Sequence, residues 1–385
     1  MSLKRMTSQE LAHKVINGDR LFILDVRNTD EFDHWRIEGK GIEIINEPYF
    51  NLLEGVDHLA KSLPKDEPIL TVCAKGGSSE FIGEQLVDAG FEQIYSLEGG
   101  MKAWSEHLEP VKIASFDHGG ALYQFVRLGK GCLSYMLVSD GQAAVIDATR
   151  MIDVYQDFAK KRSLTIKYIF DTHLHADHIS GGRALAEAIG ASATYYLPPK
   201  DAEEVTYSYE PLVEGHNVVV GQSKINVQPI YSPGHTIGST SFVIDDKYLL
   251  TGDILFVESI GRPDLAGKAE AWVADLRETL YNTYQQLSKE LIVCPAHFSH
   301  MSEMDGTGAV KATLGELFKK NEGLQVHDEE TFRKMVTENL PPQPNAYMDI
   351  RQVNMGKHKP NIEQQREMEM GPNRCAVHYK LRRME

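Results

Sequence analysis

The segment "IKYIFDTHLHADHISGG" places metal-binding side chains directly after an apolar stretch of the kind that forms a buried strand. His173, His175, Asp177 and His178 fall within six residues, and two glycines follow. Isolated histidines usually occupy surface or core positions, but four candidate ligands together at a strand end indicate a metal site. We expect an extended segment that projects His173, His175 and Asp177 to one side, with His178 opening a helix.

Three further candidate ligands stand at the ends of later strand patterns. They are His235 in "SPGHT", Asp253 in "LLTGD" and His297 in "VCPAH". Each alone would be interpreted as a turn or cap residue, but as a set they supply what a metal between strand ends needs. Their spacing does not determine which metal they bind or how many ions. Two histidines and one carboxylate suit a single iron(II), whereas the whole set also suits two zinc ions bridged by Asp253.

The chain divides into two parts with different patterns of predicted secondary structure. The first part alternates strand and helix patterns, which predicts a parallel sheet covered on both faces. The later part has consecutive short strands joined by "SDG" and Asp-Asp turns, and this pattern predicts an α/β sandwich with its site at the sheet edge. We therefore expect an α/β protein with domains over residues 1–112 and 117–355 and a polar C-terminal extension over residues 356–385.

A second reactive centre is predicted where the strand pattern "EPILTVC" meets a helix. Cys73 opens the glycine-containing loop "CAKGGSS". Inward-facing loop amides and a helix N-terminus stabilise a thiolate, so Cys73 is a candidate nucleophile. The alternative is a buried strand-end cysteine whose glycines serve only the turn. Lys75 is the one cation of this loop and the candidate residue there for binding the substrate.

Composition narrows the class of protein. The 385 residues include 40 basic and 55 acidic ones, a formal charge of −15, which disfavours nucleic acid or an anionic membrane as a partner. The sequence shows neither a signal-peptide pattern nor a membrane-spanning apolar run, so we expect a cytoplasmic enzyme. Four irregularly spaced cysteines fit a reducing compartment, and Cys132, Cys294 and Cys375 are interpreted as inert.

The HxHxDH cluster, with the histidine of "SPGHT", the aspartate of "TGD" and the histidine of "PAH", resembles the metallo-β-lactamase superfamily over residues 117–355. The resemblance implies an αββα sandwich with a metal site at the edges of two sheets. "THLHADHISGG", "GRPDL" and "CPAHFSH" look most like the persulfide dioxygenases of that superfamily. By this resemblance one Fe(II) per chain would be held by His173, His235 and Asp253, with His175, Asp177, His178 and His297 around it or at a vacant second metal position.

The segments "ILDVRNTDEFDHW", "VCAKGGSS" and "SLEGGMKAWSEH" resemble a rhodanese domain. The resemblance implies that Cys73 carries a persulfide. Rhodanese loops commonly carry arginine one and five residues after the cysteine, and here those positions are Ala74 and Ser78. This departure makes an organic persulfide at least as good a candidate donor as thiosulfate.

Taken together, the resemblances imply a rhodanese fused to an iron persulfide dioxygenase that acts in sulfide detoxification. It would oxidise a small thiol persulfide of the glutathione, coenzyme A or bacillithiol type with O2 to sulfite, with thiosulfate as a further partner. Arg262 and Asp264 would bind the thiol carrier or form a structural pair, and a homodimer is left open. The alternatives are a dinuclear zinc thioester hydrolase with a rhodanese appendage, and a non-enzymatic sulfur carrier or sensor.

Overall fold

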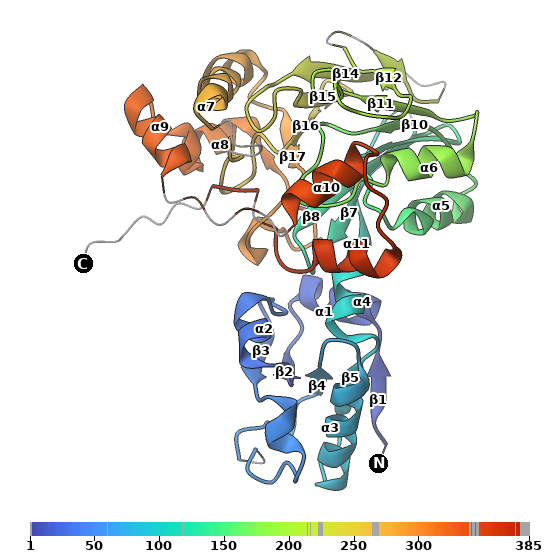
Figure 1. Ribbon diagram of the computed structural model, residues 1–385, viewed down its shortest axis with the longest axis vertical. Helices are drawn as coiled ribbons and strands as arrows, with labels where there is room; N and C mark the ends of the chain where they lie inside the picture. The colour runs from blue at the N-terminus through green and yellow to red at the C-terminus, as the bar shows by residue number, and fades with distance from the viewer. Residues whose placement is uncertain are drawn as a thin grey trace.

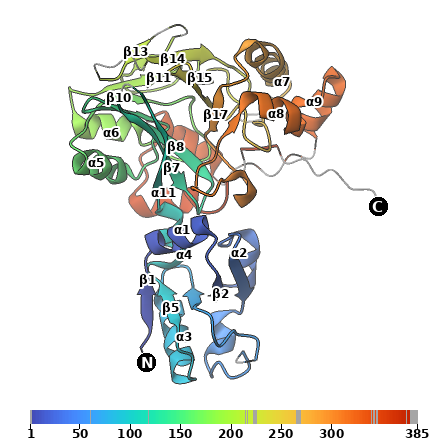
Figure 2. The ribbon, with the colours of Figure 1, turned by 180° about the vertical axis from the view of Figure 1, so that it is seen from behind.

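The computed structural model describes residues 2–377 apart from 60, 118, 214, 216, 222–225, 264–268, 339, 341–342, 344–345 and 374. Two domains are stacked along the long axis, with the N-terminal domain in the lower half of Figure 1. Figure 2 shows the same stacking from behind, with α1 and α4 next to the larger domain. Among the described residues, no helix combines the length and apolar character needed to cross a bilayer.

The N-terminal domain is built on a five-stranded sheet of order β1-β5-β4-β2-β3 in which every neighbouring pair is parallel. This confirms the predicted parallel sheet. One apolar cluster contains residues of α1 and α4, and another contains residues of α3, so helices cover both faces. The elements are β1 (Lys4–Met6), α1 (Ser8–Asn17), β2 (Leu21–Asp25), α2 (Thr29–His34), β3 (Ile42–Asn46), η1 (Tyr49–Leu52), β4 (Ile69–Val72), α3 (Gly77–Asp88), β5 (Ile94–Leu97) and α4 (Gly100–Glu106).

The larger domain contains two sheets, a seven-stranded one of order β12-β11-β10-β9-β8-β7-β6 and a six-stranded one of order β13-β14-β15-β16-β17-β18. The first comprises β6 (Glu109–Ser115), β7 (Ala121–Arg127), β8 (Cys132–Ser139), β9 (Gln142–Ile146), β10 (Thr165–Phe170), β11 (Thr194–Leu197) and β12 (Glu210–Pro211). The second comprises β13 (Val218–Val219), β14 (Asn226–Tyr231), β15 (Thr240–Ile244), β16 (Tyr248–Gly252), β17 (Ile292–Pro295) and β18 (Ala312–Thr313).

Both hairpin turns predicted from the sequence are present. Asp140 and Gly141 between β8 and β9 have φ values of 45° and 73°, and Asp245 and Asp246 between β15 and β16 both have φ of 50°. Paired positive φ values are the signature of a type I′ turn, which Asp and Gly tolerate and which matches the twist of the strands. The second hairpin sets the register of β16, the strand that ends just before Asp253.

Three apolar clusters identify the layers of this domain. The central cluster joins residues of both sheets, such as Phe170 and Phe242. A second packs α5 and α6 on the outer face of the seven-stranded sheet, and a third packs α7, α8 and α9 on the other sheet. The αββα sandwich is therefore confirmed. Its helices are α5 (Ile152–Lys161), α6 (Gly182–Ile189), α7 (Ala269–Glu278), α8 (Leu314–Lys320), α9 (Glu329–Thr337), α10 (Tyr347–Asn354) and α11 (Ile362–Glu369), with short turns η3 (Thr279–Thr283), η4 (Tyr284–Gln286), η5 (Met301–Glu303) and η6 (Glu322–Leu324).

Helix α11, in the C-terminal extension, joins the two domains (Figure 1). Glu369, 1% exposed, accepts from Arg127 at 2.9 Å and from Arg150 at 2.8 Å. Arg150 also donates to Glu106 of α4 at 2.6 Å, and Arg366 pairs with the same carboxylate. The extension is polar in composition, yet this buried network makes it part of the contact between the domains.

Candidate metal centre

The candidate ligands come from loops that follow β10, β14, β16 and β17, so they meet where strands of both sheets end. All are buried, with exposed fractions of 2% or less. They are His173, His175, Asp177, His178, His235, Asp253 and His297.

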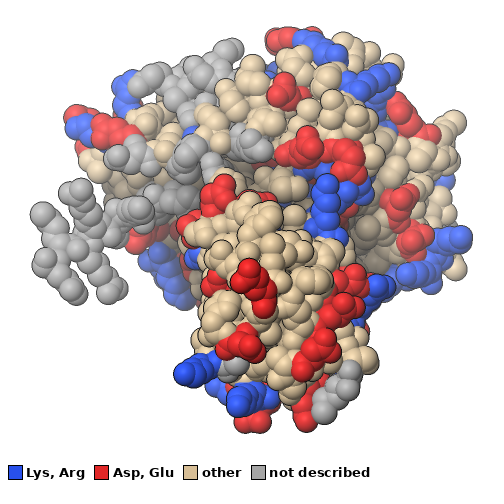
Figure 3. Space-filling view, turned by 60° about the horizontal axis from the view of Figure 1, so that its bottom comes forward, with Lys and Arg blue, Asp and Glu red and all other residues tan. Residues whose placement is uncertain are grey.

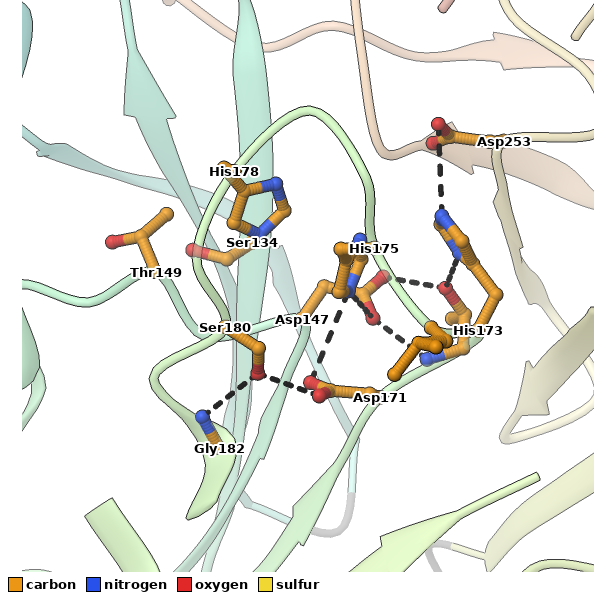
Figure 4. Close-up of polar contacts among 12 residues, drawn as sticks. Ser134, Asp147, Thr149, Asp171, His173, His175, His178, Ser180, Gly182 and Asp253 are labelled. Carbon is orange, nitrogen blue, oxygen red and sulfur yellow. Dashed lines mark hydrogen bonds and ion pairs between the residues drawn. The ribbon is translucent and has the colours of Figure 1, made fainter. Parts of the chain in front are cut away.

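The loop after β10 differs from the extended segment predicted for it. Residues 171–179 form bends, and α6 begins at Gly182, so His178 lies in the loop and does not open the helix. As Figure 4 shows, His173 points to Asp253 whereas His175 turns to Asp147 and Asp171. The prediction of an extended segment was therefore wrong, although the rings of His173 and His175 do lie beside each other, with centroids 4.2 Å apart.

Bonds to distant residues impose this loop conformation. The Asp147 carboxylate accepts from the Thr172 amide at 2.7 Å, and Asp201 accepts from the Leu174 amide at 2.9 Å. Asn354 of α10 donates to the carbonyl oxygens of His175 and His178, both at 2.9 Å. Polar side chains thus form the hydrogen bonds that this buried backbone would make with a neighbouring strand if it were part of a sheet.

His173, His235 and Asp253 form the first ligand group. Their nearest ligand atoms all lie within 4.8 Å of one another. Oδ2 of Asp253 is 3.3 Å from Nε2 of His235 and 3.8 Å from Nε2 of His173. The structure therefore brings together the three residues that the family resemblance selected for iron.

The Nδ1 atoms of His173, His235 and His297 each contact an oxygen atom of the protein. Nδ1 of His235 donates to the carbonyl oxygen of Arg262 at 2.8 Å, and Nδ1 of His173 contacts the Thr172 hydroxyl at 2.9 Å. Nδ1 of His297 points to the carbonyl oxygen of Gly131 at 3.3 Å. Protein groups that accept the Nδ1 proton leave each Nε2 lone pair free to bind a metal.

Asp177, Asp253, His297 and Cys375 form a second group with ligand atoms within the same distance of one another. Oδ1 of Asp253 lies 3.1 Å from Nε2 of His297, so the two carboxylate oxygens face different groups. Asp177 also belongs to a third group with Cys132 and His178, in which the Cys132 thiol is 3.4 Å from the carboxylate.

Charges in the centre favour a cation between the carboxylates. Burial alone would lower the pKa of His297, but Asp253 and Asp177 raise it well above its ordinary value. Burial opposes the ionisation of Asp253, yet His297, His173 and His235 lower its pKa. Burial and the neighbouring His175 lower the pKa of His173, which keeps this ring neutral and able to act as a ligand.

His175 lies in a different electrostatic setting. Burial would lower its pKa, but the hydrogen bond from Nε2 to Asp147 at 3.2 Å and the nearby Asp171 raise it to about 9. Asp147, Asp171 and His175 form a separate group of acidic and imidazole side chains. Nδ1 of His175 has no hydrogen-bond partner, so this atom stays a possible ligand for a metal.

The buried polar atoms test whether a metal fits this centre. Buried nitrogen and oxygen atoms are nearly always hydrogen-bonded. Here Nε2 of His173, His178, His235 and His297 and both carboxylate oxygens of Asp253 lack a hydrogen-bond partner. These atoms converge on the ligand groups, and imidazole with carboxylate is a donor set that binds iron or zinc. The residues fit a bound metal.

Cys73 follows β4 and opens the loop that leads into α3. The Gly76 amide donates to its sulfur at 3.0 Å, and the cysteine is 6% exposed. Lys75 is exposed. The Cys73 carbonyl accepts from the Met101 amide in the first turn of α4, so this loop contacts the helix that adjoins the larger domain.

A cavity of about 310 Å³ lies between the two domains. Trp104 of α4 and His34 line it on one side, and Gly131, Phe298 and Asn373 line it on the other. Gly131 contacts His297 through its carbonyl group, so this cavity adjoins both the metal centre and the helix that supports the Cys73 loop.

Of the two residues predicted to bind the thiol carrier, the structure describes only Arg262. Arg262 is 1% exposed, and its backbone is bonded to His235 and Cys375. Asp264 lies outside the described residues, so the Arg262–Asp264 pair stays a prediction.

Sequence analysis missed residues that hold the centre together from afar. Asp201 accepts from the Leu174 amide, the Thr236 hydroxyl and the Gly238 amide, which joins the loops of His173 and His235. Asn354 and Glu369 hold the histidine loop from the C-terminal helices. Cys375, interpreted as an inert tail residue, is fully buried at the second group. None of these residues has a local sequence signal.

Comparisons with known proteins agree with this architecture. The model of the metallo-beta-lactamase superfamily matches residues 127–297, and that of the rhodanese-like domain matches residues 7–107. Hydroxyacylglutathione hydrolase of Anaeromyxobacter dehalogenans is 31% identical over 206 residues, which make up 50% of this chain and 73% of the relative. The chain belongs to the metallo-β-lactamase superfamily. It carries an N-terminal rhodanese domain in addition.

The superfamily relatives fall into two groups of activity. Other hydroxyacylglutathione hydrolases match over 48–57% of their length, so the chain spans about half of these relatives. The mitochondrial persulfide dioxygenase ETHE1 of Mus musculus is 27% identical over 218 residues, 55% of this chain and 79% of the relative.

Two solved structures share the fold. ETHE1 from Myxococcus xanthus has a TM-score of 0.53 at 24% identity, covering 62% of this chain and 99% of that one. A metallo-beta-lactamase from Staphylococcus aureus has a TM-score of 0.55 at 24% identity, covering 62% and 73%.

Proposed function

We propose that the chain is an iron-dependent persulfide dioxygenase coupled to rhodanese sulfur transfer. The observation that carries the proposal is the grouping of His173, His235 and Asp253, while the neighbouring His175 is bonded to Asp147 through Nε2. Two histidines and one carboxylate, with further positions left open, are the ligand set of many non-haem iron(II) oxygenases. The Mus musculus persulfide dioxygenase among the relatives supports this choice.

The reaction proposed for residues 117–355 converts a thiol persulfide, O2 and water into sulfite and the free thiol. Bound iron(II) would supply the redox chemistry with O2. The protein's own contribution is to orient the ligands: Thr172 and the Arg262 carbonyl fix the rings of His173 and His235, and burial excludes bulk water from the group. Arg262 is the proposed contact for an acidic group of the thiol carrier.

Residues 1–112 are proposed to transfer sulfane sulfur through Cys73. The Cys73 thiolate would attack the outer sulfur of a donor, releasing the donor thiolate or sulfite and leaving a Cys73 persulfide. A thiol or sulfite would then accept this sulfur. The cavity between the domains, which α4 and the metal domain line together, supports coupling of the two reactions.

The second candidate function is a dinuclear zinc thioester hydrolase. The free nitrogen atoms of His178 and His297, and Nδ1 of His175, favour it because they add donors for a second metal. The hydroxyacylglutathione hydrolases among the relatives favour it as well. In that case Asp253 would bridge two ions, with one oxygen facing each group.

Elemental analysis combined with two activity assays separates these functions. The full chain, purified anaerobically, is assayed for O2 uptake with glutathione persulfide or coenzyme A persulfide, and for hydrolysis of a glutathione thioester. We expect about one iron per chain and O2 uptake that depends on persulfide. His235→Ala should abolish both, because it removes one of three ligands. His58→Ala, at an exposed histidine of the N-terminal domain, is the matched control. Two zinc ions with thioesterase activity and no O2 uptake would establish the second function instead.

A further inference from the structure

The second ligand group contains a residue from outside the segment that matches the superfamily. Cys375 lies beyond residues 127–297, yet its sulfur is within 4.8 Å of the ligand atoms of Asp177, Asp253 and His297. Cys375 is 0% exposed, and each of the other three is 1% exposed. The group therefore has one sulfur, one imidazole nitrogen and two carboxylates as donors.

Backbone hydrogen bonds on both sides of Cys375 fix its position. The Arg262 amide donates to the Cys375 carbonyl at 3.1 Å, and the Val377 amide donates to the Ile260 carbonyl at 2.9 Å. On the other side the Asn373 amide donates to the Lys130 carbonyl at 2.9 Å. The C-terminal segment is thus paired with the loop that follows Asp253, so the thiol lies beside the centre through ordered backbone contacts.

The polar atoms around the thiol are arranged as ligands of a cation would be. Nε2 of His297 and Oδ1 of Asp253 are buried 3.1 Å apart, yet neither makes a hydrogen bond of good geometry. The Nδ1 atom of His297 faces the Gly131 carbonyl, so its Nε2 lone pair is directed away from that contact. These two atoms form a close ion pair without hydrogen-bond geometry, and with the nearby sulfur of Cys375 they make a buried cluster of potential metal ligands.

We propose that Cys375 is a thiolate ligand of a divalent metal ion of the zinc class, bound together with Asp177, His297 and Asp253. Thiolate and imidazole donors favour zinc over harder ions, and four protein ligands make a closed site of the structural kind. On binding, the thiol releases its proton to solvent and forms the metal–sulfur bond, with no change in oxidation state. Asp253 can serve both groups because Oδ2 faces His235 while Oδ1 faces His297.

This site is distinct from the first group, which has three protein donors and suits catalysis. In the hydrolase alternative the second zinc ion would occupy this same position, so the new element of the proposal is the Cys375 thiolate. With iron in the first group, the two metal ions would share only Asp253. It adds a role for the C-terminal segment: binding of the metal would hold residues 375–377 against the metal domain. The rival thiol is Cys132, which lies with Asp177 and His178.

Cobalt substitution tests the proposal directly. The full chain is stripped of metal with a chelator, titrated anaerobically with Co²⁺, and scanned for the near-ultraviolet charge-transfer band of a cobalt–thiolate bond. We expect the band in the wild type, its loss in Cys375→Ser, and its retention in Cys132→Ser and in Cys73→Ser, the control in the other domain. Cys375→Ser should also lose about one zinc per chain in elemental analysis. No band in the wild type, or a band that survives in Cys375→Ser, would overturn the proposal.

A second measurement avoids the risk that a variant misfolds. X-ray absorption at the zinc edge of the zinc-loaded wild type should show one sulfur neighbour at about 2.3 Å. A spectrum with only nitrogen and oxygen neighbours would refute a thiolate ligand whatever the variants do.

Discussion

Oγ1 of Thr172 lies 2.9 Å from Nδ1 of His173, and the same hydroxyl donates to Asp147 at 3.0 Å. Because the hydroxyl proton goes to the carboxylate, Thr172 accepts the Nδ1 proton of His173, and Nε2 is left free for a metal. A side chain outside the ligand groups therefore sets the tautomer of a ligand.

Thr172→Val should weaken metal binding without unfolding the domain. Valine has nearly the shape of threonine but cannot accept the Nδ1 proton, so the ring of His173 loses its orientation. Substitutions of such partners reduce metal affinity by about 10–100-fold. Competition with a chromophoric chelator measures the affinity, and Thr172→Ser, which keeps the hydroxyl, is the matched control. Equal affinities in both variants would show that the hydroxyl does not orient His173.

Cys73→Ser should separate the two activities. Cys73 belongs to the N-terminal domain and is absent from every ligand group found among the described residues. Sulfur transfer from a persulfide to cyanide should therefore be lost, while metal content and O2 uptake on supplied persulfide stay close to those of the wild type. Loss of metal in this variant would contradict the assignment of separate sites.

The donor preference of the rhodanese domain follows from Ala74 and Ser78. Thiosulfate carries two negative charges, and each hydrogen bond from a cation to such an anion contributes about 1.5–3 kcal/mol. We expect kcat/KM for an organic persulfide to exceed that for thiosulfate, and Ser78→Arg to raise the thiosulfate value about tenfold or more. Steady-state assays of the full chain with cyanide or sulfite as acceptor give both values. A wild-type preference for thiosulfate would show that Lys75 and the loop amides suffice.

The buried carboxylate of Glu369 should make the protein sensitive to acid. Burial would raise its pKa, but Arg127 and Arg150 lower it from 4.5 to about 2. Since the folded-state pKa is the lower one, this group stabilises the fold above about pH 4.5, and the contribution disappears as the pH falls toward 2. Glu369→Gln removes one partner of a buried ion pair, which costs about 3–5 kcal/mol at neutral pH.

Urea unfolding at pH 7 and at pH 3 measures this effect. The difference in unfolding free energy between wild type and Glu369→Gln should be large at pH 7 and smaller at pH 3. Glu363→Gln, on the exposed side of the same helix, should change stability little at either pH. A pH-independent difference would mean that Glu369 acts through packing and not through its charge.

The sequence predicted the architecture well because its signals are local. Strand and helix alternation identified the parallel sheet, and the Asp-Gly and Asp-Asp turns identified hairpins. The distant ligands His235, Asp253 and His297 were found because each stands at a strand end. The direction of His175 was not predictable, because Asp147 and Asn354 fix it from other parts of the chain. The same holds for Cys375, whose burial depends on backbone pairing with residues more than a hundred positions away.

The chain has 55 acidic and 40 basic residues, and Figure 3 shows how they are distributed on one face. On the face shown in Figure 3, acidic side chains are spread over the N-terminal domain and are interspersed with basic ones. Partners of the proposed reactions are small anions, which act at buried centres and need no extended basic surface.

The C-terminal segment also has a consequence for how the protein is made. The rhodanese sheet is complete once residue 97 has been synthesised, so this domain can fold while translation continues. The larger domain cannot complete the hydrogen bonds of its loop after β10 until Asn354 and Glu369 have left the ribosome. We therefore expect metal loading to be a late event, because an incomplete nascent chain would expose the histidines without the residues that orient them.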